Sequence, residues 1–169
     1  SLANSSGIFL GGHFHFDLAR PGAALYGVAP VAGQANPLRA VIKLQGKVLQ
    51  TRTIDAGTPV GYSHTWTAQR HTRIATVAVG YADGYLRSLG NRGRASFEGV
   101  ALPVVGNVSM DTITIDVTDV AEARLAEGGL IDLAGPLDGV DAIAARAGTI
   151  GYEILTSLGR RYARNYVET

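Results

Sequence analysis

Hydrophobic and polar residues alternate along much of the chain after Pro37, which is the pattern of half-buried β-strands. The longest alternating segment covers residues 38–62 and is rich in Val, Ile and Thr. Shorter segments follow between Gly or Asp turns, namely TRIATVAVGY, RASFEGVALPVVG, DTITIDVT and GLIDLAG. The pattern predicts a mainly β fold over residues 37–169, built as an antiparallel β-barrel.

Short helices and a last strand are expected at the end of this domain. Asp141 can cap a helix that ends at Gly148, and Thr149 can cap a second helix that ends at Gly159. The segment RYARNYV then has the composition of a terminal strand.

Residues 1–36 have a different pattern. A helical turn of small residues in SLANSSG precedes the alternating stretch HFHFDLAR, which predicts a strand, and RPGAALYG predicts a short helix. Strand, loop and helix in this order are the unit of an α/β fold. We therefore expect residues 1–36 to be the end of an α/β barrel of the TIM type, with a domain boundary at residues 36 and 37.

The stretch AGTPVGYSHTWTA, residues 56–68, places Tyr62, His64 and Trp66 at every second position. In an extended chain all three rings lie on one face. Such a face is either the half-buried side of a strand or a set of groups that act on a ligand, and the stretch alone does not decide between them.

Composition narrows the class of protein. Of 169 residues, 46% are hydrophobic and 17% are charged, and the formal net charge is +1. This balance is typical of a globular domain and does not favour nucleic acid or a membrane surface as a partner. The chain has no cysteine, which excludes disulfides and thiol catalysis and is consistent with a cytoplasmic protein. We expect no metal site, because His13 and His15 have only Asp17 as a nearby carboxylate.

Six motifs carry candidate chemistry. They are ANSSG (residues 3–7), ARPGAALYG (19–27), AGTPVGYSHTWTA (56–68), GYADGY (80–85), VVGNVSMDT (104–112) and IGYEIL (150–155). Each has an ordinary structural explanation as well. ANSSG is either a helix cap or an anion site, and Met110 is either a core residue or a ligand contact.

In their order and spacing, the six motifs resemble the alanine racemase family, whose members carry a barrel followed by a β-domain and use pyridoxal 5′-phosphate (PLP). The resemblance covers essentially the whole chain. It implies interconversion of L-alanine and D-alanine by two-base proton transfer, which supplies D-alanine for the bacterial cell wall. It also implies a homodimer in which the tyrosine and methionine segments reach into the barrel of the partner subunit.

The resemblance also assigns residues. Tyr62 matches the catalytic tyrosine, Tyr81 a tyrosine of the substrate corridor, and Asp111 a gate residue. Met110 matches the residue whose backbone amide meets the substrate carboxylate. The set that binds PLP is Asn4, Ser5, Arg20, Gly22, Ala23 and Tyr152. Within this set, Arg20 matches the arginine that faces the pyridine nitrogen.

The chain departs from the family pattern in three ways. Ser63 follows the tyrosine where the family often has glycine, and Asn107 stands where many members carry arginine. Neither Lys43 nor Lys47 matches the lysine that binds PLP. Since Met110 is the only methionine, we expect the chain to be the C-terminal part of a longer protein. Because it lacks the matching lysine, we expect it to be inactive alone. A related racemase of another amino acid, or a non-catalytic β-domain for dimerisation, are the alternatives.

Overall fold

The structure is a computed structural model that describes residues 1–31 and 33–167. Its centre is a six-stranded antiparallel sheet with the order β6-β5-β8-β1-β4-β7. These strands are β1 (Leu44–Ile54), β4 (Thr72–Val77), β5 (Arg94–Phe97), β6 (Val100–Pro103), β7 (Ile113–Asp116) and β8 (Leu130–Ala134). A bridge between Val104 and Ile115 joins the two edges, so the sheet is a nearly closed barrel. The predicted mainly β antiparallel fold is confirmed.

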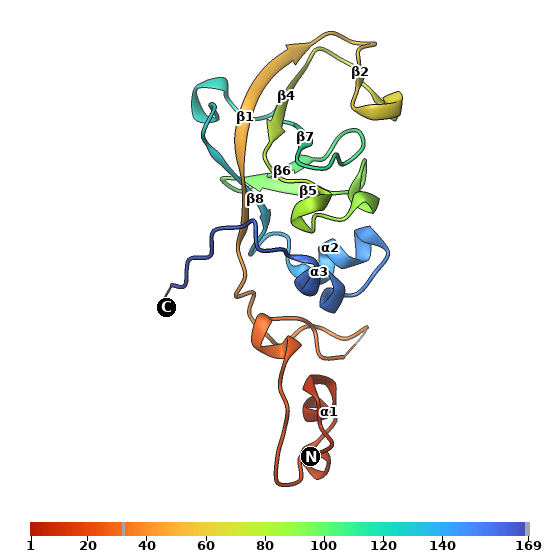
Figure 1. Ribbon diagram of the computed structural model, residues 1–169, viewed down its shortest axis with the longest axis vertical. Coiled ribbons are helices and arrows are strands. Elements are labelled where there is room, and N and C mark those ends of the chain that lie inside the picture. The colour runs from red at the N-terminus through yellow and green to blue at the C-terminus, as the bar shows by residue number, and fades with distance from the viewer. Residues whose placement is uncertain (32, 168–169) are drawn as a thin grey trace.

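The long strand β1 connects the two halves of this barrel (Figure 1). Its first residues, Leu44 to Lys47, pair with β8, and its last residues, Val48 to Ile54, pair with β4. Register shifts after Leu44 and after Val48 interrupt these ladders. Such irregularities bend a strand and increase its twist, which lets one strand belong to both halves of the barrel.

Two apolar clusters fill the domain. The larger lies inside the barrel and includes Val77, Ile113, Ile115, Ile131 and Leu133, each at most 1% exposed. The smaller lies beneath a two-stranded ribbon formed by β2 (Pro59–Val60) and β3 (Trp66–Thr67). Its members are Ile54, Val60, Ala68, Ile74 and Val105, with Trp66 packed against them. The smaller cluster thus anchors the segment that carries Tyr62 to the rest of the domain.

Two short helices lie below the barrel, α2 (Val140–Ala147) and α3 (Gly151–Ser157). Gly148 ends α2 as predicted, but the predicted N-caps Asp141 and Thr149 were wrong. The N-caps are Gly139 and Ile150, and neither makes a side-chain capping bond. The carboxylate of Asp141 instead accepts a hydrogen bond from the backbone N–H of Ala29 at 2.8 Å. A contact 112 residues away in the chain therefore takes the oxygen that a local cap would have used.

Residues 1–36 project from the end of the molecule below these helices (Figure 1). They contain α1 (Ser5–Phe9) and two 3₁₀ turns, η1 (Gly12–Phe14) and η2 (Ala23–Tyr26). The expected strand at HFHFDLAR was wrong, because this stretch folds into η1 and turns. Among the described residues, its backbone pairs only at Arg20, in an isolated bridge with Asn4, and alternation alone does not make a strand. The division after residue 36 stays a prediction.

The expected last strand at RYARNYV was also wrong, since residues 161–167 form turns and an extended tail without a strand partner. The tail runs away from the domain in Figure 1. Within the part of the chain that the structure describes, no helix has the length and apolar character needed to span a membrane.

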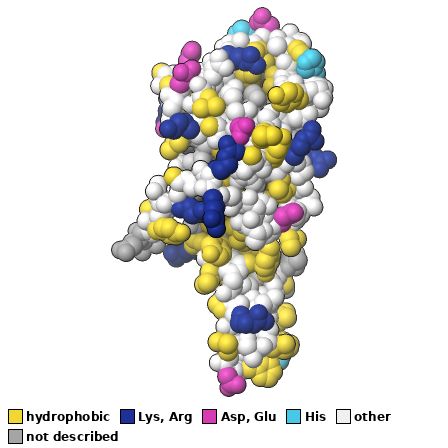
Figure 2. Space-filling view, viewed as in Figure 1, with side chains coloured by type: hydrophobic (Ala, Val, Ile, Leu, Met, Phe, Trp, Pro, Cys, Tyr) yellow, Lys and Arg dark blue, Asp and Glu magenta, His cyan; other side chains and the backbone are white. Residues whose placement is uncertain are grey.

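Hydrophobic side chains are exposed over residues 1–26. The side chains concerned are Leu2, Phe9, Leu10, Phe16, Leu18, Leu25 and Tyr26, each at least 43% exposed. Figure 2 shows such side chains on the narrow N-terminal end of the molecule. An exposed apolar surface of this extent marks an interface with other protein.

Candidate functional site

Tyr62 lies in a tight turn between β2 and β3 rather than in a strand. The residues Tyr62–His64 form the 3₁₀ turn η3, and Gly61, Ser63 and His64 all have positive φ, at 76°, 61° and 48°. The prediction that three rings share one extended face was therefore wrong. The Tyr62 side chain is 74% exposed, whereas Trp66 packs on the smaller cluster. Val60 of β2 pairs with Trp66 of β3, so the residues between them, including Tyr62, form a turn. The phenol of Tyr62 and the indole of Trp66 are therefore not on one face of a single strand.

The turn explains one departure from the family pattern. A φ of 61° places Ser63 in the left-handed region, where a residue with a Cβ costs about 1 kcal/mol and glycine costs little. A glycine at this position would adopt this backbone conformation more easily than serine does. Ser63 adopts this left-handed conformation at a cost in backbone strain.

Tyr62 opens onto a cavity of about 570 Å³. The lining residues are Tyr62, Tyr81, Arg87, Asn107, Val108, Ser109, Met110, Asp111 and Thr112. The structure therefore brings together the four residues expected to contact substrate, although they come from three separate motifs. The Met110 side chain is 54% exposed, which excludes a role in the core.

Close backbone packing sets the positions of Tyr81 and Met110. The backbone N–H of Tyr81 donates to the carbonyl of Ser109 at 3.0 Å, and that of Ala82 donates to the carbonyl of Met110 at 2.9 Å. A Cβ on Gly80 would lie 2.2 Å from the Met110 carbonyl oxygen. Only glycine allows this approach, so the first residue of GYADGY holds the methionine segment in place.

Arg161 ties this part of the site to the C-terminal tail. Its guanidinium contacts Asp111 at 2.8 Å and Asp83 at 3.3 Å. The hydrogen bond to Asp111, followed by the charge of Asp83, raises the pKa of Arg161. The sequence offered no signal for this role, because Arg161 lies 50 residues from Asp111 in a segment taken for a charged strand. The residue expected to act as a gate is thus held by an ion pair.

The residues expected to bind PLP form a second group in residues 1–36. The hydroxyl oxygen of Ser5 is buried and accepts hydrogen bonds from the N–H groups of Gly22 at 2.9 Å and Ala24 at 3.1 Å. Asn4 caps α1 through its side-chain oxygen, which accepts from Gly7 N–H at 3.0 Å. Arg20 donates from Nε to Ser1 Oγ at 3.0 Å. Ala23 is buried beside this network.

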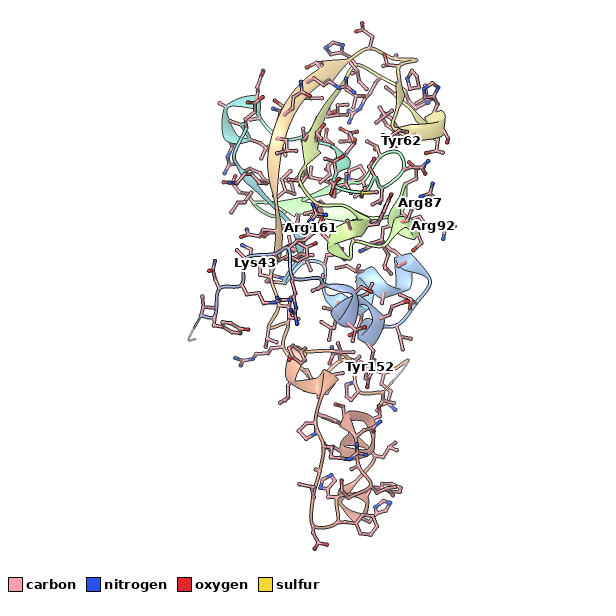
Figure 3. All side chains as sticks on the ribbon, in the orientation of Figure 1. Lys43, Tyr62, Arg87, Arg92, Tyr152 and Arg161 are labelled. Carbon is pink, nitrogen blue, oxygen red and sulfur yellow. The ribbon has the colours of Figure 1, made fainter. Side chains whose placement is uncertain are left out.

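The two groups lie at different levels of the molecule. Tyr62 is beside the barrel, whereas Tyr152 lies below the helices, next to residues 1–36 (Figure 3). Within one chain, Tyr62 does not contact the hydrogen-bonded residues Ser5, Gly22 and Ala24, which are called here the Ser5 group. Lys43 lies elsewhere, at the start of the barrel, where Nζ forms an ion pair with Asp132 at 3.2 Å. Among the described residues, no group of three His, Asp or Glu side chains could hold a metal ion.

Comparison with known proteins places this fold and site. The family model for the alanine racemase C-terminal domain matches residues 41–166, and the model for its N-terminal domain matches residues 1–30. Alanine racemase of Rhodospirillum rubrum is 59% identical over 98% of this chain and 44% of its own length. The catabolic alanine racemase of Mesorhizobium japonicum is 54% identical over 99% of the chain and 43% of its own length.

Solved structures agree with the sequence comparison. Alanine racemase of Bartonella henselae, crystallised with covalently bound pyridoxal phosphate, has a TM-score of 0.90 and 48% identity over 98% of this chain and 46% of its own. The biosynthetic enzyme of Pseudomonas aeruginosa also has a TM-score of 0.90, with 36% identity over 99% of this chain and 47% of its own.

A nearly closed antiparallel β-barrel that follows a segment of short helical turns is the class of domain that the family model for residues 41–166 describes. The chain belongs to the alanine racemase family. It spans less than half the length of the relatives that it matches.

Proposed function

We propose that the protein to which this chain belongs interconverts L-alanine and D-alanine with PLP, and that Tyr62 is the base on the L-alanine side. The observation that carries the proposal is the exposed phenol of Tyr62 at a cavity shared with Tyr81, Met110 and Asp111. The Tyr62 phenol is 74% exposed, so it does not pack in the core of this chain. It is carried by a turn whose residues Ser63 and His64 have a strained, left-handed backbone. It is placed for contact with something outside this chain.

The other residues of the cavity have separate roles. Among the described residues, the backbone N–H of Met110 has no hydrogen-bond acceptor, so it is available to donate to a substrate carboxylate. Tyr81 narrows the cavity, and the ion pair of Asp111 with Arg161 fixes its rim. These contacts would orient the Cα–H bond of L-alanine toward the phenol oxygen, where general acid–base transfer takes place.

The Ser5 group fits the phosphate of PLP. The oxygen of Ser5 already accepts two hydrogen bonds, so its own proton remains to be donated to an anion. A Cβ at Gly22 would meet no atom within 4 Å, which leaves room for a ligand beside the loop. Asn4, Ala23 and Tyr152 complete the proposed set, and Arg20 would face the pyridine nitrogen. When bound, PLP withdraws electrons from Cα and so makes its proton acidic.

The second base and the attachment point for PLP are proposed to be a lysine outside this chain, because Lys43 is paired with Asp132 and lies directly before β1, away from the Ser5 group. The chain alone is therefore proposed to be inactive. We further propose a homodimer, since Tyr62 lies beside the barrel (Figure 3), whereas α1, which begins at Ser5, lies near the opposite, N-terminal end of the molecule (Figure 1). Two copies would bring the Tyr62 cavity of one to the PLP loop of the other.

The test is Tyr62→Phe in the complete enzyme, with solvent-deuterium exchange at Cα followed separately from each enantiomer. Exchange from L-alanine is expected to fall by about 10²–10⁴-fold, the usual contribution of a general base. Exchange from D-alanine and PLP content should persist. Tyr166→Phe is the matched control, because Tyr166 is 92% exposed on the C-terminal tail. Equal loss from both enantiomers would contradict the assignment of Tyr62.

A further inference from the structure

The turn that carries Tyr62 is tied to the neighbouring loops by two asparagines. We propose that Asn91 and Asn107, called here the asparagine pair, are positioning residues that hold the Tyr62 phenol where it can reach Cα. The inference rests on the proposed function of Tyr62. Neither residue needs to touch the substrate in order to act in this way.

Asn107 holds the start of the turn. Its side-chain Nδ2 donates to the backbone carbonyl of Tyr62 itself at 2.8 Å. A Cβ on Gly61 would lie 3.4 Å from the backbone nitrogen of Asn107, so the two loops lie in close contact at this point. The carbonyl that belongs to the proposed catalytic residue is thereby fixed to the wall of the cavity.

Asn91 holds the end of the turn. Its Nδ2 lies 3.3 Å from the carbonyl of Thr65 and 3.2 Å from the Thr65 hydroxyl. Its Oδ1 accepts from the backbone N–H of Gly106 at 2.7 Å. One amide therefore joins the turn to the loop that carries Asn107. Asn91 itself has a φ of 58°, a left-handed conformation that asparagine tolerates better than most residues.

Such support is needed because the turn is strained and exposed. Ser63 and His64 are consecutive residues in the left-handed region, and residues 61–65 are all exposed. The smaller apolar cluster supports Val60 and Trp66 on either side, but it does not include residues 61–65. Conformations of this kind persist only where surrounding contacts hold them. Within the described chain, the side-chain bonds to this turn come from the asparagine pair.

The consequence for catalysis follows from geometry. The phenol oxygen lies at the far end of the tyrosine side chain, so a small rotation of the Tyr62 backbone moves it a long way. A misplacement of about 1 Å can cost about 10²-fold in rate. An arginine at position 107 would carry charge into the cavity, whereas asparagine uses its amide to hold Tyr62.

The experiment uses the complete enzyme with the isosteric variants Asn107→Asp and Asn91→Asp. A carboxylate has nearly the same shape but cannot donate, so Asn107→Asp removes the bond to the Tyr62 carbonyl and Asn91→Asp removes the bond to the Thr65 carbonyl. Asn91→Asp keeps the acceptor for Gly106. Exchange of the Cα proton from L-alanine is expected to fall by about 10–100-fold. Exchange from D-alanine and PLP content should stay within about twofold, because the Ser5 segment is untouched.

Relief of strain gives a second readout. Ser63→Gly makes the left-handed conformation easier to adopt, so it should recover part of the L-side exchange lost in Asn107→Asp. A residue with a merely structural role would not show this recovery together with an unchanged D-side rate. The matched control is Asn165→Ala, at an exposed position on the tail, which should change neither rate.

The outcomes separate this proposal from the proposed function. If Tyr62→Phe abolishes L-side exchange while both aspartate variants retain it, the asparagine pair is overturned and the function of Tyr62 stands. Equal losses from both enantiomers in the aspartate variants would also overturn the positioning role. If Tyr62→Phe itself leaves L-side exchange intact, the proposed function fails first, and the role of the pair fails with it.

Discussion

Gly80→Ala tests whether the GYADGY segment positions the methionine segment through backbone packing. Gly80 has φ −148° and ψ −167°, an extended conformation that alanine adopts equally well. Any effect of the substitution must therefore come from the added methyl group. That group would lie 2.2 Å from the Met110 carbonyl oxygen and 2.5 Å from the Asp111 nitrogen.

The magnitude follows from the rigidity of these neighbours. Contacts of a Cβ below 3.0 Å are essentially never found, so the Met110 backbone must retreat from 2.2 Å to at least that distance. The shift disrupts the bonds from Tyr81 to Ser109 and from Ala82 to Met110. Overpacking of this kind costs about 1–3 kcal/mol. For a chain of this length, the unfolding midpoint should fall by about 2–12 °C.

The assay is thermal unfolding of the 169-residue chain, followed by circular dichroism. Gly12→Ala is the control, because a Cβ there meets nothing within 4 Å and the residue is exposed. In the complete enzyme, Gly80→Ala should also raise the KM for alanine, since the Met110 amide moves. An unfolding midpoint within 1 °C of the control would refute the reasoning, because it would mean that the two segments do not pack as described.

Two further predictions concern the buried tyrosine Tyr85 and the two lysines. Burial, followed by the nearby charge of Asp138, raises the pKa of Tyr85 above its ordinary value near 10. The fold thus favours the neutral phenol, and this contribution to stability is present below about pH 10 and is lost as pH rises further. Tyr85→Phe should therefore lose less of its urea-unfolding free energy than the parent chain between pH 9 and pH 11, and equal losses would contradict this. Borohydride reduction of the isolated chain with PLP should leave no stoichiometric adduct. A single adduct on Lys43 or Lys47 would contradict the proposal that neither lysine binds PLP.

Strand positions could be predicted because their alternation reflects burial on one face of the barrel. Segments such as TRIATV and DTITID became β4 and β7 as expected. HFHFDLAR and RYARNYV alternate too, yet no neighbouring strand pairs with them among the described residues, and they form turns. The pattern of a strand is local, but its hydrogen bonds are not.

Turn geometry at Tyr62 could not be predicted either. Left-handed backbone at Ser63 and His64 runs against the preference of both residues, so local sequence favoured extension. The pairing of β2 with β3 and the smaller apolar cluster override that preference. The predicted N-cap at Asp141 failed for a similar reason, since its carboxylate bonds to Ala29 rather than to its own helix.

The sequence by itself determined the mainly β fold, the family and the residues that gather at the cavity, because these depend on residue type and order. The tertiary structure decided how those residues are held. Arg161 reaches Asp111 from 50 positions away, and Asn91 reaches Thr65 from 26. Such contacts join segments that are unrelated in sequence, and their partners are set only when the barrel closes. A motif points to Tyr62 as the proposed base, but the support of its turn depends on the packing of loops.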